Sequence, residues 1–266
     1  KWNIEFVGRD TMPLVVTEPS PHVTLVTIDN EAKRNAMSRQ MMAEMAALWD
    51  SLESSNCRAV VITGVGEKAF CAGADISGDL SADESAARII NRALLKDSVF
   101  SRPIVAAVNG VCAGGGVELL LSTDIRISAD TARFGLPEVV WSIYPFGGAT
   151  VKLINQIGYV RAMDLLLTGE MVEADFAERI GLINEVVAPA DVLPKALAKA
   201  GKIADNSPTA VQAVKTQISS MIADAAKARE AMEQTLGDRV RASADFVEGV
   251  AAFREKRRPD YSNTNK

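Results

Sequence analysis

Two glutamates are the residues of this sequence whose type and spacing could do chemistry. Glu118 follows three glycines in AGGGVELLL (residues 113–121), and Glu138 lies in FGLPEVVW (134–141). A carboxylate among apolar residues suffers costly desolvation unless it has partners. Two such carboxyls that divide their protons between them can act as a general base and a general acid. The sequence therefore predicts acid–base chemistry at Glu118 and Glu138.

Two glycine-containing segments could stabilise negative charge on a substrate. Glycine allows a backbone to approach a ligand closely, and the first N–H groups of a helix have no partner within it. We expect residues 103–121 to run from a strand through a glycine turn into a helix, and CAGADI (71–76) to repeat this arrangement. One amide from each loop would form an oxyanion hole for a carbonyl or thioester. The spacings of the nucleotide-binding glycine motifs are absent.

Each feature also has an ordinary explanation when it is taken alone. A glycine-rich turn more often serves close packing, and a helical glutamate such as Glu118 usually lies on a solvated face. Glu138 could be a surface residue after a proline turn. His22 is the sole histidine, so Ser–His and Cys–His catalysis and multi-histidine metal sites lack their parts. We interpret Cys71 and Cys112 as packing residues and expect no metal site.

The composition indicates one large domain, or one domain with an appendage. The 266 residues are 48% hydrophobic and 24% charged, as in ordinary globular proteins. A net charge of -5 offers no general attraction to nucleic acid or to an anionic membrane. Three cysteines, an odd number, indicate reduced thiols in a cytoplasmic protein. No apolar run is long enough for a membrane span, and no secretory signal is visible, although the sequence begins at Lys1 without a methionine.

Strand and helix patterns alternate through the first part of the chain. Strands are expected at 22–29, 58–64, 102–110 and 123–129, and a helix at 37–55. This rhythm predicts an α/β fold with covered sheets. After about residue 190 the patterns are helical only, which predicts a helical C-terminal subdomain whose apolar stripes could form a subunit interface.

Longer segments resemble the crotonase superfamily and, within it, the enoyl-CoA hydratases. The segments that carry the resemblance are KRNAMS (33–38), KAFCAGADI (68–76), PIVAAVNGVCAGGGVELLLSTDIRIS (103–128), ARFGLPEV (132–139), DLLLTGEMVEADFAERIGLINEVV (164–187) and FREKRRPDY (253–261). The resemblance implies a spiral of ββα units with a helical C-terminal region that mediates trimers, often paired into hexamers. It assigns residues 1–200 to a spiral core with an acyl-CoA site and 201–266 to a helical trimerisation region.

The resemblance also implies a reaction, the syn addition of water across a trans-2-enoyl-CoA double bond. The amides of Ala74 and Gly115 would form the oxyanion hole. Glu118 would activate the water that attacks the β-carbon, and protonated Glu138 would deliver a proton to the α-carbon. Because the two carboxyls titrate as a pair, this split of roles stays open at this point.

Further positions match the family's contacts to coenzyme A or to the acyl group. They are Lys33, Arg34, Ala72, Asp75, Ile76, Gly114, Phe146, Phe253 and Lys256. Asp75 is also a candidate helix-start residue. No cofactor is expected beyond the coenzyme A of the substrate, and the expected partners are further copies of the chain, with neither nucleic acid nor membrane.

Three positions depart from the family pattern. Glu31 replaces a common proline, Ser77 replaces a lysine, and Phe146 stands where many hydratases have glycine. Trp141 and Tyr144 make the same wall unusually aromatic, so chain-length preference is open. Two alternatives remain: another reaction through a thioester enolate (isomerisation or dehydration of a special 3-hydroxyacyl-CoA), or a non-catalytic acyl-CoA or RNA binder.

Overall fold

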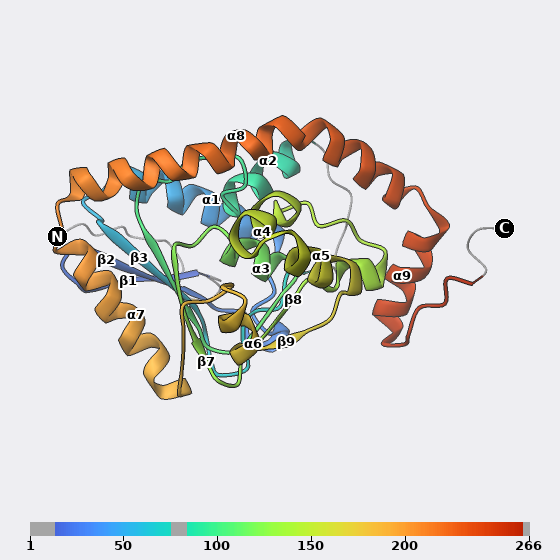
Figure 1. Ribbon diagram of the computed structural model, residues 1–266, viewed down its shortest axis with the longest axis horizontal. Coiled ribbons are helices and arrows are strands. Elements are labelled where there is room, and N and C mark those ends of the chain that lie inside the picture. Colours follow the sequence, from blue (N-terminus) through green and yellow to red (C-terminus); the bar gives the residue numbers. More distant parts are fainter. Residues whose placement is uncertain (1–13, 76–83, 263–266) are drawn as a thin grey trace.

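Two β-sheets share the strands of this chain, whose computed structural model describes residues 14–75 and 84–262 (Figure 1). The large sheet has the order β1 (Leu14–Ser20), β2 (Val23–Ile28), β3 (Ala59–Gly64), β5 (Ile104–Val108), β7 (Ile125–Ala129) and β10 (Glu185–Val187). The small sheet has the order β4 (Ala69–Cys71), β6 (Val111–Ala113), β8 (Arg133–Gly135) and β9 (Val172–Glu173). Pairing is parallel except for β1 with β2 and β8 with β9.

Three successive strand pairs step from the large sheet to the small one. They are β3 and β4, β5 and β6, and β7 and β8. The helical elements that follow these pairs are α2 (Glu84–Ala93), α3 (Gly115–Leu120), and then η2 (Pro137–Trp141), α4 (Ala149–Ile157) and α5 (Tyr159–Thr168). This stepping is a spiral of ββα units, so the predicted fold class is confirmed. It also brings the ends of β4, β6 and β8 together at one edge of the small sheet.

The core explains why the sequence patterns were informative. All residues of β3 and β5 are buried, as in a parallel sheet covered on both faces. α1 (Arg39–Glu53) buries an apolar stripe that includes Met45 and Trp49, and α7 (Pro189–Ala204) packs across β3, β5 and β7. The four strands expected at 22–29, 58–64, 102–110 and 123–129 and the helix expected at 37–55 are all present.

The C-terminal part of the chain is helical, as predicted. α8 (Pro208–Arg241) runs along one side of the molecule, and α9 (Ala244–Glu255) follows at its far end (Figure 1). Both helices start at serine N-caps, Ser207 and Ser243, whose side chains accept hydrogen bonds from the first turn. No helix in the described ranges is long and apolar enough to cross a membrane. The boundary at residue 200 stays a prediction.

Candidate active site

The KRNA segment forms a rigid turn beside the first loop of the site. A short 3-10 helix, η1 (Glu31–Lys33), is followed by Arg34 and Asn35, both with positive φ (54° and 57°). Asn35 is buried, and its side-chain amide donates to Val65 O (3.0 Å) and Ala69 O (2.7 Å). These bonds satisfy the buried amide and fix an otherwise unfavourable backbone conformation.

The amide of Ala74 is held beside that of Gly115. Met37 N donates to Gly73 O (2.8 Å) and Asp75 N donates to Met37 O (2.9 Å), so the Ala74 N–H between them points the other way. A Cβ atom placed on Gly115 would lie 3.4 Å from Ala74 N. Gly115 is the first residue of α3, where an N–H has no partner within the helix. Among the described residues, neither amide has a hydrogen-bond partner.

The other two glycines of the loop have different reasons to be glycine. Gly114 has a positive φ (54°), and a Cβ on it would lie 3.1 Å from Glu138 Oε1. Gly116 packs so closely on β4 that a Cβ would lie 2.1 Å from Cys71 O. The loop therefore combines close packing at Gly116 with an open backbone at Gly114 and Gly115.

Glu118 is buried within α3 rather than solvated. Its Oε1 accepts a hydrogen bond from Ala149 N (3.3 Å), and a Cβ on Gly147 would lie 2.4 Å from its Oε2. Burial raises the pKa of Glu118 to about 7, and the amides of Ala149 and Gly147 and two lysines, Lys96 and Lys152, oppose that rise. The carboxyl is thus poised to lose its proton near neutral pH.

The two lysines lie against the Gly147–Ala149 turn, which also contacts Glu118. A Cβ on Gly148 would lie 3.1 Å from Lys96 Cγ and 3.5 Å from Lys152 Cε. Lys152 is fully buried, and burial lowers its pKa to about 7. Its Nζ donates to Leu95 O (2.7 Å), to Ser122 Oγ (2.8 Å) and to Leu94 O (3.3 Å), so it is well satisfied.

Glu138 lies in η2 and has a different environment. Its Oε2 is buried and has no hydrogen-bond partner in the described part of the chain. Burial and, to a smaller extent, the charge of Glu118 raise the pKa of Glu138 to about 8. Its Oε1 faces Gly114, on the loop that also carries Gly115. Two carboxyls and two unpartnered amides therefore surround one short loop.

Four of the positions predicted to contact coenzyme A lie together. Lys33 Nζ is 2.7 Å from Asp75 Oδ2, and Ala72 N donates to Arg34 O (3.1 Å). Gly114 lies on the neighbouring loop. Asp75 therefore has an ion-pair partner from η1. Ile76, the helix start expected there and Ser77 lie outside the described residues.

Phe253 and Lys256 lie elsewhere, on the last helix. The Phe253 ring meets the Trp141 ring edge-on, with centroids 5.2 Å apart, and α9 packs against η2 and α8. Lys256 caps the end of α9 with a φ of 55°. Phe253 thus packs on η2, the element that carries Glu138, and Lys256 follows at the end of the same helix. Their contact with the nucleotide stays a prediction.

The Phe146 ring is directed at α8. A Cβ on Gly237 would lie 1.8 Å from Phe146 Cζ, and the Arg241 guanidinium lies 4.5 Å from the ring centroid. The Tyr144 ring is 5.1 Å away. Phe146 thus anchors the long helix to the segment before α4, and its predicted effect on the acyl pocket stays untested.

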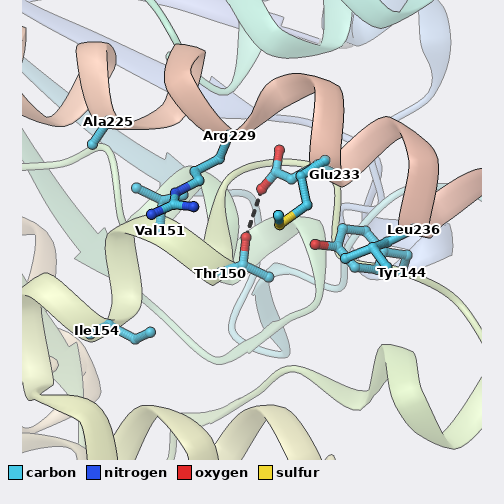
Figure 2. A pocket seen from close by; sticks show the side chains of 9 residues that line it. Tyr144, Thr150, Val151, Ile154, Ala225, Arg229, Glu233 and Leu236 are labelled. Carbon is cyan, nitrogen blue, oxygen red and sulfur yellow. Dashed lines mark hydrogen bonds between the residues drawn. The ribbon is translucent and has the colours of Figure 1, made fainter.

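A pocket of 330 Å³ opens between α4 and α8 (Figure 2). Its lining residues are Tyr144, Thr150, Val151, Ile154, Ala225, Arg229, Met232, Glu233 and Leu236. Most of them are apolar, but Thr150 Oγ1 donates to the buried Glu233 Oε1 at one wall (2.6 Å). The pocket therefore borders the start of α4, next to the amide that binds Glu118.

Sequence reasoning missed the surroundings of Glu118. Gly147, Ala149, Lys96, Lys152 and Glu233 were not among the predicted site residues. Two of them gave a signal, because a lysine in the apolar run ATVKLINQI and a glutamate in the small-residue stripe of α8 are both unexpected in buried positions. The glycine and alanine contribute backbone or space, which no pattern of side chains reveals.

The remaining sequence expectations concern residues without a proposed chemical role. Cys71 and Cys112 are fully buried, and burial raises the pKa of both thiols, that of Cys71 to about 12. His22 Nδ1 is 2.9 Å from Asn56 O, beside the start of β2. Within the described ranges, no three His, Cys, Asp or Glu side chains are grouped as metal ligands would be.

Comparisons with known proteins extend over nearly the whole chain. The sequence profile of the family described as enoyl-CoA hydratase/isomerase matches residues 18–264. An enoyl-CoA hydratase of Mycobacterium tuberculosis is 39% identical over 94% of this chain and 97% of its own. A short-chain-enoyl-CoA hydratase of Clostridium acetobutylicum is 36% identical over 92% of this chain and 95% of its own. The crystal structure of a carnitinyl-CoA hydratase from Mycobacterium avium has a TM-score of 0.86 and 34% identity, and covers 94% of this chain and 98% of its own.

Proposed function

Because the chain belongs to the enoyl-CoA hydratase/isomerase family, we propose that it adds water to trans-2-enoyl-CoA thioesters and forms 3-hydroxyacyl-CoA. The observation that carries this proposal is the pair of glutamates beside two unpartnered amides. Hydration needs one ionised and one protonated group near neutral pH. Glu118 and Glu138 have raised pKa values of about 7 and about 8, which suits that division.

In the proposed reaction the amides of Ala74 and Gly115 donate to the thioester oxygen. They stabilise the negative charge that develops there when water adds to the β-carbon. Ionised Glu118 takes one proton of that water, and Glu138 gives its proton to the α-carbon. The hydroxyl and the hydrogen add to the same face because both carboxyls adjoin one loop. Proton exchange then restores the starting state.

The split of roles follows from the surroundings of each carboxyl. Lys96 and Lys152 favour the ionised form of Glu118, whereas no cation opposes the rise at Glu138. The buried, unpartnered Oε2 of Glu138 has no donor that would favour ionisation. These differences support Glu118 as the base and Glu138 as the acid.

The same proposal covers substrate binding. Lys33, Arg34, Ala72, Asp75 and Gly114 would hold the coenzyme A portion next to the two amides, and Ile76, Phe253 and Lys256 would extend this contact. Phe146 would influence the acyl group through the wall between α4 and α8. The reaction needs the acyl-CoA and water alone.

We further propose that the chain assembles as a homotrimer or as a pair of trimers. Apolar side chains are exposed on two helices: Val214, Ile218 and Met221 on α8, and Tyr159, Val160 and Leu167 on α5. Their spacing on α8 makes a continuous stripe, and contiguous exposed apolar surface is typical of an interface. Residues 201–266 would supply part of it. The expectation of a cytoplasmic protein stays a prediction.

The test is the loss of the conjugated enoyl-thioester absorbance on addition of enzyme to crotonyl-CoA and to a longer 2-enoyl-CoA. We expect turnover of at least one of them, with 3-hydroxyacyl-CoA identified as product by mass spectrometry. Conversion of a 3-enoyl-CoA to the 2-enoyl isomer with negligible hydration would replace the proposal by isomerisation. No turnover of any enoyl-CoA, together with salt-sensitive RNA binding, would favour a non-catalytic role.

A further inference from the structure

A second buried carboxylate ties the Gly147–Ala149 turn to the long C-terminal helix. Glu233 lies on α8 and is 3% exposed. Its Oε1 accepts a hydrogen bond from Thr150 Oγ1 (2.6 Å), as Figure 2 shows, and its Oε2 is 2.6 Å from Lys96 Nζ. The side chains of Lys96 and Glu233 are each only 4% exposed. Glu233 therefore joins two separate parts of the molecule.

Both partners of Glu233 lead directly to Glu118. Thr150 follows Ala149, whose amide donates to the Glu118 carboxyl. Lys96 is one of the two lysines that oppose the burial-driven rise in the pKa of Glu118. Thr150 therefore connects Glu233 to Glu118 through the adjacent Ala149 amide, and Lys96 connects them through its charge.

Glu233 lies on a face of α8 that contacts the region around Glu118 at several positions. Glu230 Oε1 accepts from Asn91 Nδ2 (3.2 Å), and Gly237 and Arg241 meet the Phe146 ring. Together with Glu233, these positions recur every three to four residues, which is the spacing of one helix face. This face therefore docks α8 on the segments around the proposed base.

The hydrogen bond between Glu233 and Thr150 lies at the wall of the pocket between α4 and α8. Val151 and Ile154 of α4, and Met232 and Leu236 of α8, line the pocket rather than filling it (Figure 2). A buried ion pair such as Lys96–Glu233 is weak evidence for stability, because desolvation offsets much of the attraction. The contribution of the Lys96–Glu233 pair is then to position the groups around it and not to stabilise the fold.

We propose that Glu233 is a positioning residue for Glu118: it fixes the start of α4 through Thr150 and compensates the charge of Lys96. The inference rests on the proposed function, in which Glu118 activates water. Other ionisable groups also lie near Glu118 or Glu233. Lys152 from α4 and Glu138 from η2 also face Glu118, and Tyr144 and Arg229 line the same pocket as Glu233.

The first variant, Thr150→Val, removes the hydrogen bond without changing charge. We expect kcat to fall roughly 10-fold, because a small displacement of a reacting group is costly. KM for the enoyl-CoA is expected to stay nearly unchanged, since Thr150 is not among the residues proposed to hold coenzyme A. Thr150→Ser keeps the hydroxyl and is expected to restore the wild-type kcat. Loss of kcat in both variants alike would contradict a role for the hydroxyl.

The second variant, Glu233→Gln, keeps the shape but leaves Lys96 uncompensated. The additional positive charge favours ionised Glu118, so the acid limb of kcat/KM moves to lower pH, and kcat falls as well. Thr150→Val is expected to leave the position of that limb unchanged. The two variants therefore separate the effect of charge from the effect of geometry.

A matched control is available on the same helix. Lys215, itself buried, also makes an ion pair between α8 and the body, with the more exposed Asp124 (2.6 Å), at the other end of α8. Lys215→Met is expected to lower Tm while kcat and the acid limb stay as in the wild type. If Glu233→Gln and Thr150→Val also lower Tm alone, with kcat and pH profile unchanged, the proposal is overturned.

A readout without turnover keeps this inference distinct from the proposed function. In protein labelled with ¹³C-glutamate, the Glu118 carboxyl is assigned from the signal that Glu118→Gln removes, and its titration is followed in wild type and in Glu233→Gln. A lower titration midpoint in the variant supports the positioning role even if the wild type is inert on every enoyl-CoA. An unchanged midpoint and line shape overturn it even if hydration is observed.

Discussion

The two glutamates of the site lie in contrasting surroundings, although they adjoin the same loop. Glu118 is on a helix, accepts a hydrogen bond from the Ala149 amide and faces two lysines. Glu138 is on a 3-10 helix, has a buried oxygen without a partner and faces the charge of Glu118. Burial raises the pKa of both; two backbone amides and two lysines oppose the rise at Glu118, whereas a single backbone amide opposes it at Glu138. Identical side chains thus have pKa values raised to different levels, about 7 and about 8.

In the proposed mechanism, this contrast gives a site without histidine both an acid and a base. The difference between the two carboxyls arises from the backbone around them. The Gly147–Ala149 turn packs against the Glu118 carboxyl, whereas the Glu138 carboxyl lies against Gly114. Variants that remove a carboxyl, crowd it or shift its pKa should therefore have different effects at Glu118 and at Glu138.

The largest effect is expected from removing either carboxyl. Glu118→Gln and Glu138→Gln should each lower kcat/KM by roughly 100- to 10,000-fold, because each removes a positioned acid or base. The measurement is hydration of crotonyl-CoA by loss of absorbance.

The double variant supplies the control for this prediction. Because the two groups act in one step, it should be little slower than the slower single variant. Full hydration by Glu118→Gln on short and long substrates would contradict the assignment, and so would strictly multiplicative losses.

Crowding the two carboxyls should have the next largest effect. A Cβ at Gly147 would lie 2.4 Å from Glu118 Oε2, so Gly147→Ala must displace the carboxyl, and we expect roughly a 100-fold loss of kcat. A Cβ at Gly114 would be 3.1 Å from Glu138 Oε1, so Gly114→Ala should cost less activity but destabilise the positive-φ backbone by about 1 kcal/mol. Steady-state kinetics and urea unfolding measure the two effects.

Two glycines outside the site are matched controls for that pair. Gly201 has no positive φ and Gly181 has a φ of 79°, and a Cβ on either would meet nothing within 4 Å. Gly201→Ala should change neither activity nor strain, and Gly181→Ala should lower stability without lowering kcat. A loss of kcat in Gly181→Ala equal to that in Gly114→Ala would mean that backbone strain, and not the contact with Glu138, is responsible.

The pH profile tests the protonation states directly. Glu118 must be ionised, so kcat/KM should decline as pH falls through about 7; Glu138 must be protonated, so it should decline as pH rises through about 8. The wild type should therefore show a narrow bell. In Glu118→Gln the charge that raises the pKa of Glu138 is gone, so the alkaline limb of the residual activity should move to lower pH. A flat profile between pH 6 and 9 would contradict the shared-proton pair.

Much of the fold was predictable because its strands carry simple patterns. The continuous apolar runs of β3 and β5 and the stripe of α1 predict covered parallel strands and a packed helix, and the structure has them. The helical end of the chain was predictable for the same reason. The stepping of strand pairs between two sheets was predicted by the family resemblance alone, since β4, β6 and β8 have three residues each, too few for a pattern.

The site was predictable where side-chain type is unusual. Glutamates in apolar segments drew attention to Glu118 and Glu138, and the family resemblance added the amides of Ala74 and Gly115. The Gly147–Ala149 turn was hidden because it acts through an amide and through the absence of a side chain. The contacts of Glu233 were hidden because its partners, Thr150 and Lys96, lie far from it along the chain.

The smallest effect is expected from removing one of the cations that distinguish Glu118. Lys152 has a pKa lowered to about 7, so it is only partly charged at neutral pH. Lys152→Met keeps an unbranched side chain, shorter by one atom, and removes that charge, which favours protonated Glu118. The acid limb of kcat/KM should therefore move to higher pH by less than about one unit, under a 10-fold change in rate at a fixed pH.

The alkaline limb decides whether that change is specific to Glu118. No lysine in the described part of the chain shifts the pKa of Glu138, so the alkaline limb should stay in place in Lys152→Met. Lys195→Met, which breaks an exposed pair with Glu185, is the control and should move neither limb. If Lys152→Met shifts both limbs equally, the lysine acts on the pair as a whole, and the contrast between the two glutamates must come from burial and backbone donors alone.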